Sequence, residues 1–571
     1  MPTLAEVRAT LTGPGGPFEV ITDLVDGVEM KVYAERLPNL RAVAEIAATR
    51  GDDEPFLVYG ERRIGFGSFF ELANSVAEGL AGVGVGHGDR VAVLSANNPE
   101  WCASFWATVN LGAVLVGLNG WWKTDEILYG LQDSGARVLV ADRGRFVRIA
   151  DQLDELPDLE AVFLIDAEPT EVGDDPRIHA FDELTHHSGA GFPTTAIEEA
   201  DPAVIFYTSG TTGRPKGAIS THRNMIANLQ NTIFNTVAMT MVADDPGTDT
   251  GPAPRTTALL TSPLFHVSGC HSSLVVGTLG GLKIVIPEGK FEPAKALQLI
   301  QDEQVTIWAT VPTMVWRVCE SPERDDFDTT SVTSVAFGGS PSADELQRMV
   351  LETFPNVRST SNAYGLTESS SVATVINGAD ALAKPTSVGP PMPVVDIRII
   401  DAAGDEVAQG GTGEVLIRGP IIMAGYWGKP EATAETVIDG WLHTGDIGRL
   451  DDDGFLYITD RAKDMIIRGG ENIYCVEIEQ RLVDHPDIAD AAVIGVAHPE
   501  LGEEVKAVVQ VAPGSPLTAD EVRTWVAETL ANFKVPTYVE LTDEKLPRNA
   551  SGKLLKNVLR GDGEVSFAET M

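Results

Sequence analysis

Short apolar runs alternate with amphipathic segments from about residue 67 to residue 339. The run "RVAVLS" (90–95) has the composition of a buried strand, and "NPEWCASFWATVNLG" (98–112) follows it with helical spacing and with Pro99 near the first turn. Further apolar runs, again separated by predicted helices, are "VLVGLN" (114–119), "VLVAD" (138–142), "AVIFYTS" (203–209), "LKIVIP" (282–287), "IWATVP" (307–312) and "SVAFGG" (334–339). This alternation favours parallel sheets covered on both faces, so we predict an α/β protein whose large part holds two such layers.

The pattern changes after about residue 388. "VDIRIID" (395–401), "GEVLIRG" (413–419) and "GFLYITD" (454–460) are short strands joined by turn-rich segments, which is typical of antiparallel β structure. A last unit of apolar strands and amphipathic helix begins near residue 464. We therefore predict a large domain over residues 1–459, made of two α/β subdomains and a β-rich subdomain, and a small α+β domain over residues 464–571.

The 571 residues carry a formal net charge of −41, because 42 Lys and Arg face 83 Asp and Glu. Nucleic acids and anionic membranes need basic faces, so this charge argues against both as main partners. The four cysteines are far apart and form no CxxC pair, which favours reduced thiols in the cytoplasm over a disulfide framework or a zinc site. Apolar runs long enough to span a bilayer are absent from the sequence, and the first residues carry no signal-peptide pattern.

The stretch "FYTSGTTGRPKGAIS" (206–220) combines hydroxyls, glycines and a lysine directly after an apolar strand. Glycines let backbone N–H groups converge on an anion, and the hydroxyls and the ammonium of Lys216 add donors suited to phosphate. The order differs from a Walker A loop, because Pro215 precedes the lysine and Gly217 follows it. From its own residues, the stretch fits either a polar surface loop or a polyphosphate cradle.

Five other motifs accompany this stretch. They are "LFHVSG" (264–269), "NAYGLTES" (362–369), "WLHTGDI" (441–447), "DRAKDMIIRGGENIY" (460–474) and "LPRNASGK" (546–553). In order and approximate spacing the set resembles the core motifs of the adenylate-forming (AMP-binding) acyl-CoA synthetase superfamily, and the resemblance covers nearly the whole chain. It implies an AMP-forming acid–thiol ligase that activates a carboxylic acid with ATP to acyl-AMP, releases pyrophosphate, and then forms a thioester with coenzyme A.

The resemblance also implies which residues bind ATP. The loop 208–216 would hold the β- and γ-phosphates, Tyr364 would stack on adenine, and Asp446 would accept hydrogen bonds from the ribose hydroxyls. Glu368 would ligate Mg²⁺, a hard cation that takes carboxylate and phosphate oxygens, and Thr367 would contact the α-phosphate. The complete implied ATP-binding set is Thr208, Ser209, Gly210, Thr211, Thr212, Gly213, Lys216, Gly339, Ser340, Asn362, Ala363, Tyr364, Gly365, Asp446 and Arg461.

The resemblance implies that the hinge and the small domain supply the main catalytic lysine, the rotation between the two steps and the contacts with CoA. In the family, the lysine at the position of Lys553 bridges the carboxylate and the α-phosphate in the transition state, so Lys553 is the implied main catalytic residue. Residues 460–463 would form a hinge, with Lys463 at the family's hinge position. Rotation about it would withdraw Lys553 after adenylation and bring Gly469 and Gly470 to the site, where the pantetheine arm of CoA would pass close to backbone.

The acid is less well defined by the sequence. His266 follows Phe265 where amino-acid-activating relatives carry Asp, so an amino acid substrate is disfavoured. The implied acyl pocket comprises His266, Val267, Cys270 and Gly338. Its small apolar surroundings suit a fatty or other hydrophobic acid, which would place the protein in fatty acid and lipid metabolism. Trp308 and Met314 fit either a pocket wall or plain core.

Several alternatives stay open at this level. The acyl group could pass to a carrier protein in place of CoA, the acid could be aromatic, or the enzyme could stop at acyl-AMP. A non-enzymatic ATP-binding scaffold is the alternative from a different class, and the intact Glu368, Arg461 and Lys553 argue against it. The thiolate of CoA could react without a general base, or His266 could contribute one. A homodimer is one option for the oligomeric state.

Overall fold

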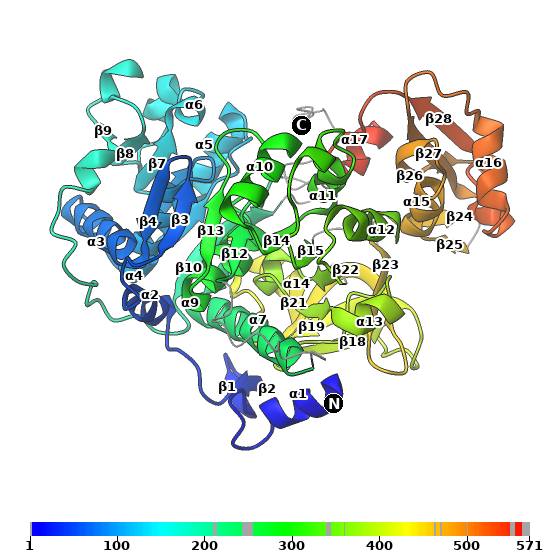
Figure 1. Cartoon of the computed structure of the whole chain (residues 1–571), viewed down its shortest axis with the longest axis horizontal. Coiled ribbons are helices and arrows are strands. Elements are labelled where there is room, and N and C mark those ends of the chain that lie inside the picture. The colour runs from blue at the N-terminus through cyan, green and yellow to red at the C-terminus, as the bar shows by residue number, and fades with distance from the viewer. Residues whose placement is uncertain are drawn as a thin grey trace.

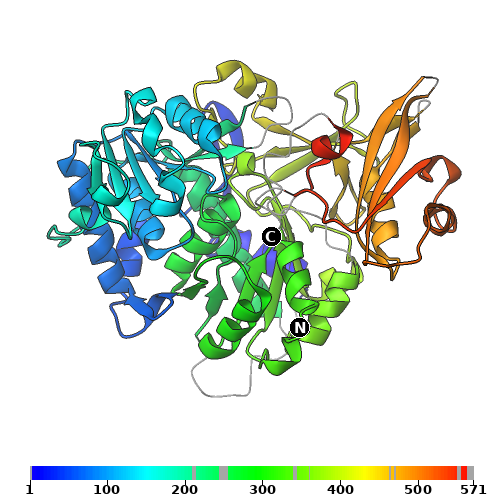
Figure 2. The same ribbon diagram turned by 90° about the horizontal axis from the view of Figure 1, so that it is seen from above.

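The computed structural model describes residues 3–208, 214–242, 255–338, 344–358, 360–461, 464–468, 471–499, 501–548 and 554–561. Two eight-stranded sheets and a five-stranded sheet form the larger part of the molecule, and a second five-stranded sheet with its helices stands to one side (Figures 1 and 2). This architecture confirms the predicted fold class. The boundaries at residues 459, 460–463 and 464 stay predictions.

The first eight-stranded sheet is parallel from β10 to β9 and antiparallel at its other end. Its strands, in spatial order, are β20 (Gly425–Tyr426), β11 (Lys216–Thr221), β10 (Pro202–Thr208), β6 (Val114–Gly117), β5 (Arg90–Leu94), β7 (Val138–Asp142), β8 (Ala161–Ile165) and β9 (Ile178–Ala180). The apolar run at 90–95 is thus a central strand, as its composition predicts.

The second eight-stranded sheet is parallel in its centre and closes with an antiparallel strand at each edge. Its strands, in spatial order, are β17 (Thr374–Ile376), β16 (Thr360–Tyr364), β15 (Ser334–Gly338), β14 (Ile307–Thr310), β12 (Thr257–Leu259), β13 (Lys283–Ile286), β3 (Pro55–Tyr59) and β4 (Arg62–Gly65). Thr360–Tyr364 of β16 carries part of the predicted adenine site to one end of this sheet.

The largest hydrophobic core lies between these two sheets and combines side chains from both with a layer of helices. The helices of this layer are α2 (Leu40–Ala48), α3 (Phe66–Gly82), α4 (Pro99–Asn110), α7 (His222–Val242) and α9 (Val276–Gly280). Helix α4 is buried along its whole length, and Asn98 caps it by accepting a hydrogen bond from the Trp101 N–H, so the helix predicted to begin near Pro99 is confirmed.

The outer faces of the two sheets carry separate helices and cores. The first sheet is covered by α5 (Thr124–Ser134) and α6 (Arg143–Phe146), and the second by α10 (Pro293–Glu303), α11 (Pro312–Cys319) and α12 (Asp344–Thr353). Trp308 and Met314 belong to the second of these cores, and the Trp308 indole N–H donates a 3.0 Å hydrogen bond to Thr261 Oγ1. Of the two alternatives for these residues, the structure therefore supports core packing.

The β-rich subdomain is antiparallel, as predicted. It contains β18 (Asp396–Ile400), β19 (Gly413–Arg418), β21 (Val437–Ile438), β22 (Trp441–Leu450), β23 (Leu456–Arg461), α13 (Gly378–Ala383) and α14 (Pro430–Thr436). At the other end of the chain, α1 (Leu4–Thr12) and the hairpin of β1 (Val20–Val25) and β2 (Val28–Tyr33) lie beside α7 (Figure 1).

The C-terminal unit has a hydrophobic core of its own. It contains β24 (Ile466–Arg468), β25 (Glu471–Ile473), α15 (Cys475–Val483), β26 (Ile488–His498), β27 (Gly502–Val511), α16 (Ala519–Ala527), β28 (Tyr538–Thr542) and α17 (Lys556–Arg560). Across the ranges described above, we find no helix with the length and apolarity that membrane crossing requires.

Candidate active site

The stretch predicted to bind phosphate connects the two strands of a β-hairpin. Strands β10 and β11 pair antiparallel up to Thr208 and Lys216, and the Thr208 hydroxyl donates a 3.4 Å hydrogen bond to the Lys216 carbonyl. The predicted loop residues Ser209, Gly210, Thr211, Thr212 and Gly213 lie outside the described residues. The hairpin places the described ends of the loop at the carboxyl end of β10, where ligands bind in parallel sheets of this kind.

Tyr426 brings the lysine of this hairpin and the predicted metal ligand together. Its hydroxyl donates a 2.8 Å hydrogen bond to Oε1 of Glu368, and the Lys216 ammonium lies 4.8 Å from the centre of its ring. Burial, and then the charge of Glu368, raise the pKa of Tyr426 well above its ordinary value, so the phenol is a proton donor at neutral pH. We did not predict Tyr426, because β20 has only two residues and no periodic pattern marks it.

Tyr364 and Arg461 both contact Asp446, and all three residues are predicted to bind ATP. The Tyr364 hydroxyl donates a 2.7 Å hydrogen bond to Oδ2 of Asp446, and Nε of Arg461 lies 3.0 Å from Oδ1. Asp446 and Arg461 are direct partners in the β22–β23 ladder, and Asp446 is buried at 3% exposure. Burial, and then the charge of Asp446, raise the pKa of Tyr364 well above its ordinary value. Three predicted ATP-binding residues from two sheets are thus adjacent.

The predicted residues Asn362 and Ala363 belong to β16, where they pair with Phe337 and Gly338 of β15. Gly338 therefore lies beside the predicted adenine site. Gly339 and Ser340 follow it outside the described residues.

The turn after Tyr364 is strained and tightly held. A Cβ on Gly365 would lie 1.5 Å from the Ser371 carbonyl oxygen, so the backbone approach requires glycine. Ser370 and Ser371 have φ values of +50° and +111°, and the second of these is rare outside glycine. Thr367 and Glu368 lie in the one-turn helix η6 (Thr367–Ser369) inside this turn, so its shape decides where they point.

Hydroxyls and one histidine hold the strained serines from the neighbouring segment. Ser272 and Ser371 hydroxyls lie 2.5 Å apart, Ser220 and Ser370 hydroxyls lie 3.1 Å apart, and the His271 ring donates through Nδ1 to the Ser370 carbonyl at 3.1 Å. His271 is buried, which lowers its pKa to about 4, so it is neutral at pH 7. It lies in a π-helical segment, η4 (Cys270–Val275), which is a rare element that occurs most often at functional sites. We did not predict these supports.

Three of the four predicted acyl-pocket residues, His266, Val267 and Cys270, lie at the start of the same segment, whereas Gly338 ends β15. His266 precedes the short helix α8 (Val267–Gly269) and caps it, with Nδ1 accepting a 3.4 Å hydrogen bond from the Ser268 N–H. Val267 and Cys270 are buried in the core between the two large sheets, and burial raises the pKa of the Cys270 thiol well above its ordinary value. Their proposed contact with an acyl group stays a prediction.

The C-terminal residues predicted to act in the hinge, in CoA binding and in catalysis lie outside the described part of the chain. This applies to Lys463, Gly469, Gly470 and Lys553. After Lys553 the chain continues into α17, where Lys556 forms a buried 2.8 Å ion pair with Glu479 of α15 and Arg560 lies 3.1 Å from Asp464. The described residues after Lys553 are therefore packed on the C-terminal unit.

Glu368 offers a single carboxylate to a metal ion. Among the described residues, we find no group of three or more His, Cys, Asp and Glu side chains that could enclose a metal. Mg²⁺ commonly binds through one or two carboxylates together with substrate phosphates. A lone Glu368 beside the β10–β11 hairpin, whose loop is predicted to bind phosphate, fits that arrangement. It would not fit a metal held by protein ligands alone.

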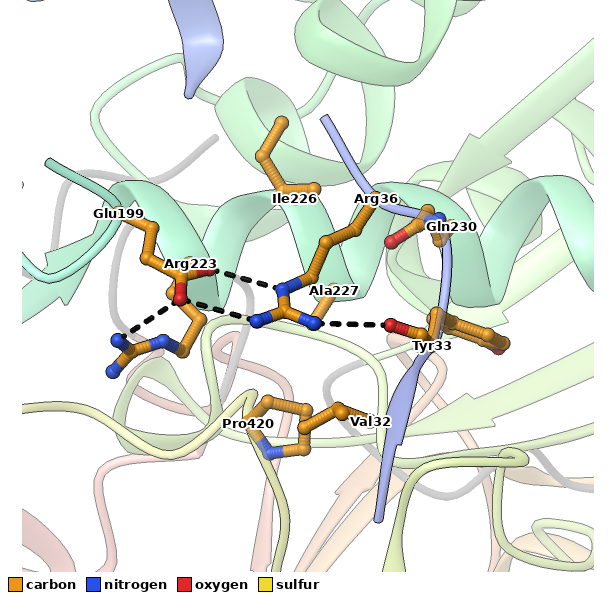
Figure 3. A pocket seen from close by; sticks show the side chains of 9 residues that line it. All are labelled: Val32, Tyr33, Arg36, Glu199, Arg223, Ile226, Ala227, Gln230 and Pro420. Atoms are coloured by element: carbon orange, nitrogen blue, oxygen red, sulfur yellow. Dashed lines mark hydrogen bonds and ion pairs between the residues drawn. The ribbon is translucent and has the colours of Figure 1, made fainter. Parts of the chain in front are cut away.

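A separate small pocket lies between the hairpin of β1 and β2 and helix α7 (Figure 3). Glu199 connects two guanidinium groups there, with Arg36 Nε at 3.0 Å and Arg223 at 3.3 Å. None of its lining residues belongs to the predicted site. These ion pairs attach the N-terminal hairpin to the core of the molecule.

Comparisons with known proteins agree with this geometry. The chain matches the model of the AMP-binding enzyme family over residues 43–427 and the model of the AMP-binding enzyme C-terminal domain over residues 477–553. It is 35% identical over 508 residues to feruloyl-CoA synthase of Amycolatopsis sp., which covers 86% of this chain and 93% of that protein. It is 32% identical over 500 residues to the long-chain-fatty-acid–CoA ligase FadD13 of Mycobacterium tuberculosis, with coverage of 87% and 93%. The solved structure of o-succinylbenzoate CoA synthetase from Bacillus subtilis with its acyl-adenylate intermediate matches with a TM-score of 0.75 and 29% identity, over 92% of this chain and 98% of that one.

Proposed function

Because the chain belongs to the AMP-binding enzyme family, we propose that it is an AMP-forming acyl-CoA ligase whose substrate is a hydrophobic carboxylic acid. The observation that most supports this is the contact of Tyr364, Asp446 and Arg461, since a flat ring, a buried carboxylate and a guanidinium beside one another suit a nucleoside monophosphate. ATP and coenzyme A are the co-substrates of such a reaction.

The nucleoside would be bound first by shape and then by hydrogen bonds. Tyr364 would stack on the adenine, with Asn362 bonding to the base edge and the thin backbone at Gly338 on the other side. Oδ2 of Asp446 already accepts one hydrogen bond from Tyr364 and Oδ1 forms an ion pair with Arg461, and each oxygen retains capacity for a ribose hydroxyl. Arg461 would orient this carboxylate through their ion pair and face the ribose or the α-phosphate.

In the first half-reaction, a carboxylate oxygen of the acid attacks the α-phosphorus of ATP, and the bond from that phosphorus to the bridging oxygen breaks, so that pyrophosphate leaves. Two anions approach each other, and positive charge with good alignment does most of the catalysis. Lys216 would face the β- and γ-phosphates, Thr367 the α-phosphate, and Lys553 the reacting oxygens. Glu368 would hold Mg²⁺, which supplies further charge neutralisation at the phosphates.

In the second half-reaction, the thiolate of CoA attacks the acyl carbon, and the carbon–oxygen bond to AMP breaks. We propose that the small domain turns about Lys463 between the two steps. Gly469 and Gly470 would then lie along the pantetheine arm. The acceptor could instead be the pantetheine of a carrier protein, which contains the same thiol.

For the acid, we favour an aliphatic chain of the kind found in fatty acids. The segment 267–281 is small and apolar, and the family relatives include a long-chain-fatty-acid–CoA ligase. An aromatic acid is the second candidate, because the 35% identical relatives are named feruloyl-CoA synthase. We place the reaction in the cytoplasm, as the four cysteines are buried free thiols.

Acid-dependent release of AMP tests this function. Purified protein is incubated with ATP, Mg²⁺ and a panel of fatty, aromatic and amino acids, with CoA, with a carrier protein, or with neither. We expect sustained AMP release only with a hydrophobic acid and CoA together. Release that depends on the carrier protein would support the acyl-AMP ligase alternative, and release that never depends on a thiol would contradict the ligase proposal.

A further inference from the structure

Helix α5 carries a carboxylate that connects this helix to two other segments of the molecule. Asp133 has only 12% of its side chain exposed. Lys429 donates to its Oδ1 at 2.7 Å, and the hydroxyl of Tyr207 donates to its Oδ2 at 2.9 Å. Tyr129, one helical turn earlier on α5, has its hydroxyl 3.1 Å from Oδ1. The four residues form a cluster that we call the Asp133 anchor.

The Asp133 anchor contacts both described ends of the phosphate loop. Tyr207 immediately precedes Thr208, the last described residue before the loop. On the other side, the Tyr129 hydroxyl lies 3.0 Å from the Pro215 carbonyl oxygen, and the Arg214 guanidinium lies 4.9 Å from the centre of the Tyr129 ring. Because a phenol has one proton, Tyr129 can donate to Pro215 or to Asp133 but not to both at once.

A further contact ties Lys429 to the same hairpin. The Trp427 N–H donates a 2.8 Å hydrogen bond to the Gly217 carbonyl, so the segment that carries Lys429 is bonded to β11 directly after the loop. Burial, and then Asp133, raise the pKa of Tyr207, and the hydrogen bond to Asp133 is the largest cause that raises the pKa of Lys429. Tyr207 therefore stays a donor, with the Gly130 carbonyl at 3.2 Å as its second acceptor, and Lys429 stays charged beside the carboxylate.

We propose that Asp133 is a positioning residue that fixes the two ends of the phosphate loop, through Tyr207 on one side and Tyr129 on the other, and thereby sets the affinity for the β- and γ-phosphates of ATP. This inference rests on the proposed function, in which residues 208–216 bind those phosphates.

Comparing the affinities for ATP and for AMP distinguishes this role from a merely structural one. AMP lacks the two phosphates that the loop would hold, so a positioning defect should weaken ATP binding alone. Dissociation constants for ATP with Mg²⁺ and for AMP are measured by calorimetry on the full chain, together with the melting temperature. We expect Asp133→Asn to weaken ATP binding about tenfold or more and Tyr129→Phe about three- to tenfold, with AMP affinity changed less than about twofold. Tyr129→Phe keeps the ring under Arg214 and serves if Asp133→Asn does not fold.

The matched control residues make the same kinds of hydrogen bond at a distance from the loop. Asp396 accepts from Lys31 at 2.7 Å and from Arg418 at 3.0 Å, and Tyr457 donates to Asp451 at 3.2 Å. Asp396→Asn and Tyr457→Phe should leave both affinities unchanged.

The outcomes distinguish this inference from the proposed function. Equal weakening of ATP and AMP by the anchor variants, or no change in either, would overturn the positioning role. If the wild-type protein binds ATP no more tightly than AMP, loop 208–216 does not bind the β- and γ-phosphates. The proposed role of Asp133 is then wrong as well.

Discussion

The hydroxyl of Tyr426 donates a 2.8 Å hydrogen bond to Oε1 of Glu368, while the ring of the same tyrosine lies 4.8 Å from the ammonium of Lys216. One side chain thus contacts both a cation of the β10–β11 hairpin and the carboxylate proposed to hold Mg²⁺.

Tyr426→Phe should raise the Mg²⁺ concentration needed for half-maximal ATP–pyrophosphate exchange by about three- to tenfold, because the carboxylate loses the donor that orients it. The ring and its contact with Lys216 remain, so the apparent affinity for pyrophosphate should change little. Tyr457→Phe is the control. An unchanged Mg²⁺ requirement in Tyr426→Phe would show that Glu368 is oriented by other contacts.

Asp446→Ala should lower kcat/KM for ATP by about 10- to 100-fold, since the carboxylate proposed to accept two ribose hydroxyls is lost. The specific signature is the loss of discrimination between ATP and 2′-deoxy-ATP in the variant. Tyr364→Phe keeps the ring for adenine and should have a smaller effect, of about threefold to tenfold. Should Asp446→Ala discriminate between the two nucleotides as well as wild type does, the ribose assignment would be wrong.

Gly365→Ala should abolish adenylation or folding, because the new Cβ would lie 1.5 Å from the Ser371 carbonyl oxygen and backbone cannot yield easily there. Gly191→Ala is the control, as a Cβ there meets nothing within 4 Å. Pyrophosphate exchange and the melting temperature of both variants check this. Normal exchange by Gly365→Ala would mean that the strained turn does not set the position of Thr367 and Glu368.

Lys553→Ala should reduce adenylation by about 10²- to 10³-fold, in line with the loss of a preorganised charge at the reacting oxygens. Thioester formation from supplied acyl-AMP should be spared, because the proposed rotation removes this residue before that step. The two half-reactions are assayed separately, with acyl-AMP and CoA in the second. Equal loss in both would refute the rotation of the small domain.

The protein should lose stability as the pH falls from 6.5 toward 4, in part through His222. Burial lowers the pKa of His222 to about 4, below the value near 6.5 of an unfolded chain, while its Nδ1 accepts a 3.1 Å hydrogen bond from the Leu40 N–H. Between these values the unfolded state binds more protons, so the stability is fully present above pH 6.5 and is lost as the pH drops through the folded pKa. Between pH 6.5 and 5 this amounts to about 2 kcal/mol.

His222→Asn keeps an acceptor near the position of Nδ1 and should reduce the acid sensitivity of the melting temperature. Part of the sensitivity should remain, because His271 also has its pKa lowered to about 4 by burial. Denaturation curves at several pH values test this. An identical pH dependence in wild type and variant would mean that folding does not shift the pKa of His222.

The sequence by itself determined the kinds of element and their order. The strand at 90–95 and the helix that begins at Pro99 were predictable, since apolar runs, helical spacing and an Asn cap act over a few residues. The antiparallel β structure after residue 388 was also predictable, from its short strands and turn residues. The resemblance of the ordered motifs indicated the family. It also favoured a phosphate-binding loop over a polar surface loop for the stretch 206–220.

Only the tertiary structure decided which distant side chains meet. Tyr426 and Glu368 are 58 positions apart, and Asp133 and Lys429 are 296 apart. The positive φ values of Ser370 and Ser371 and the core location of Trp308 were equally unpredictable from local pattern. Helix propensity and hydrophobic periodicity are determined by residues within one or two turns of the chain. These contacts depend instead on how the sheets pack, and packing is fixed by many weak interactions that act together across the fold.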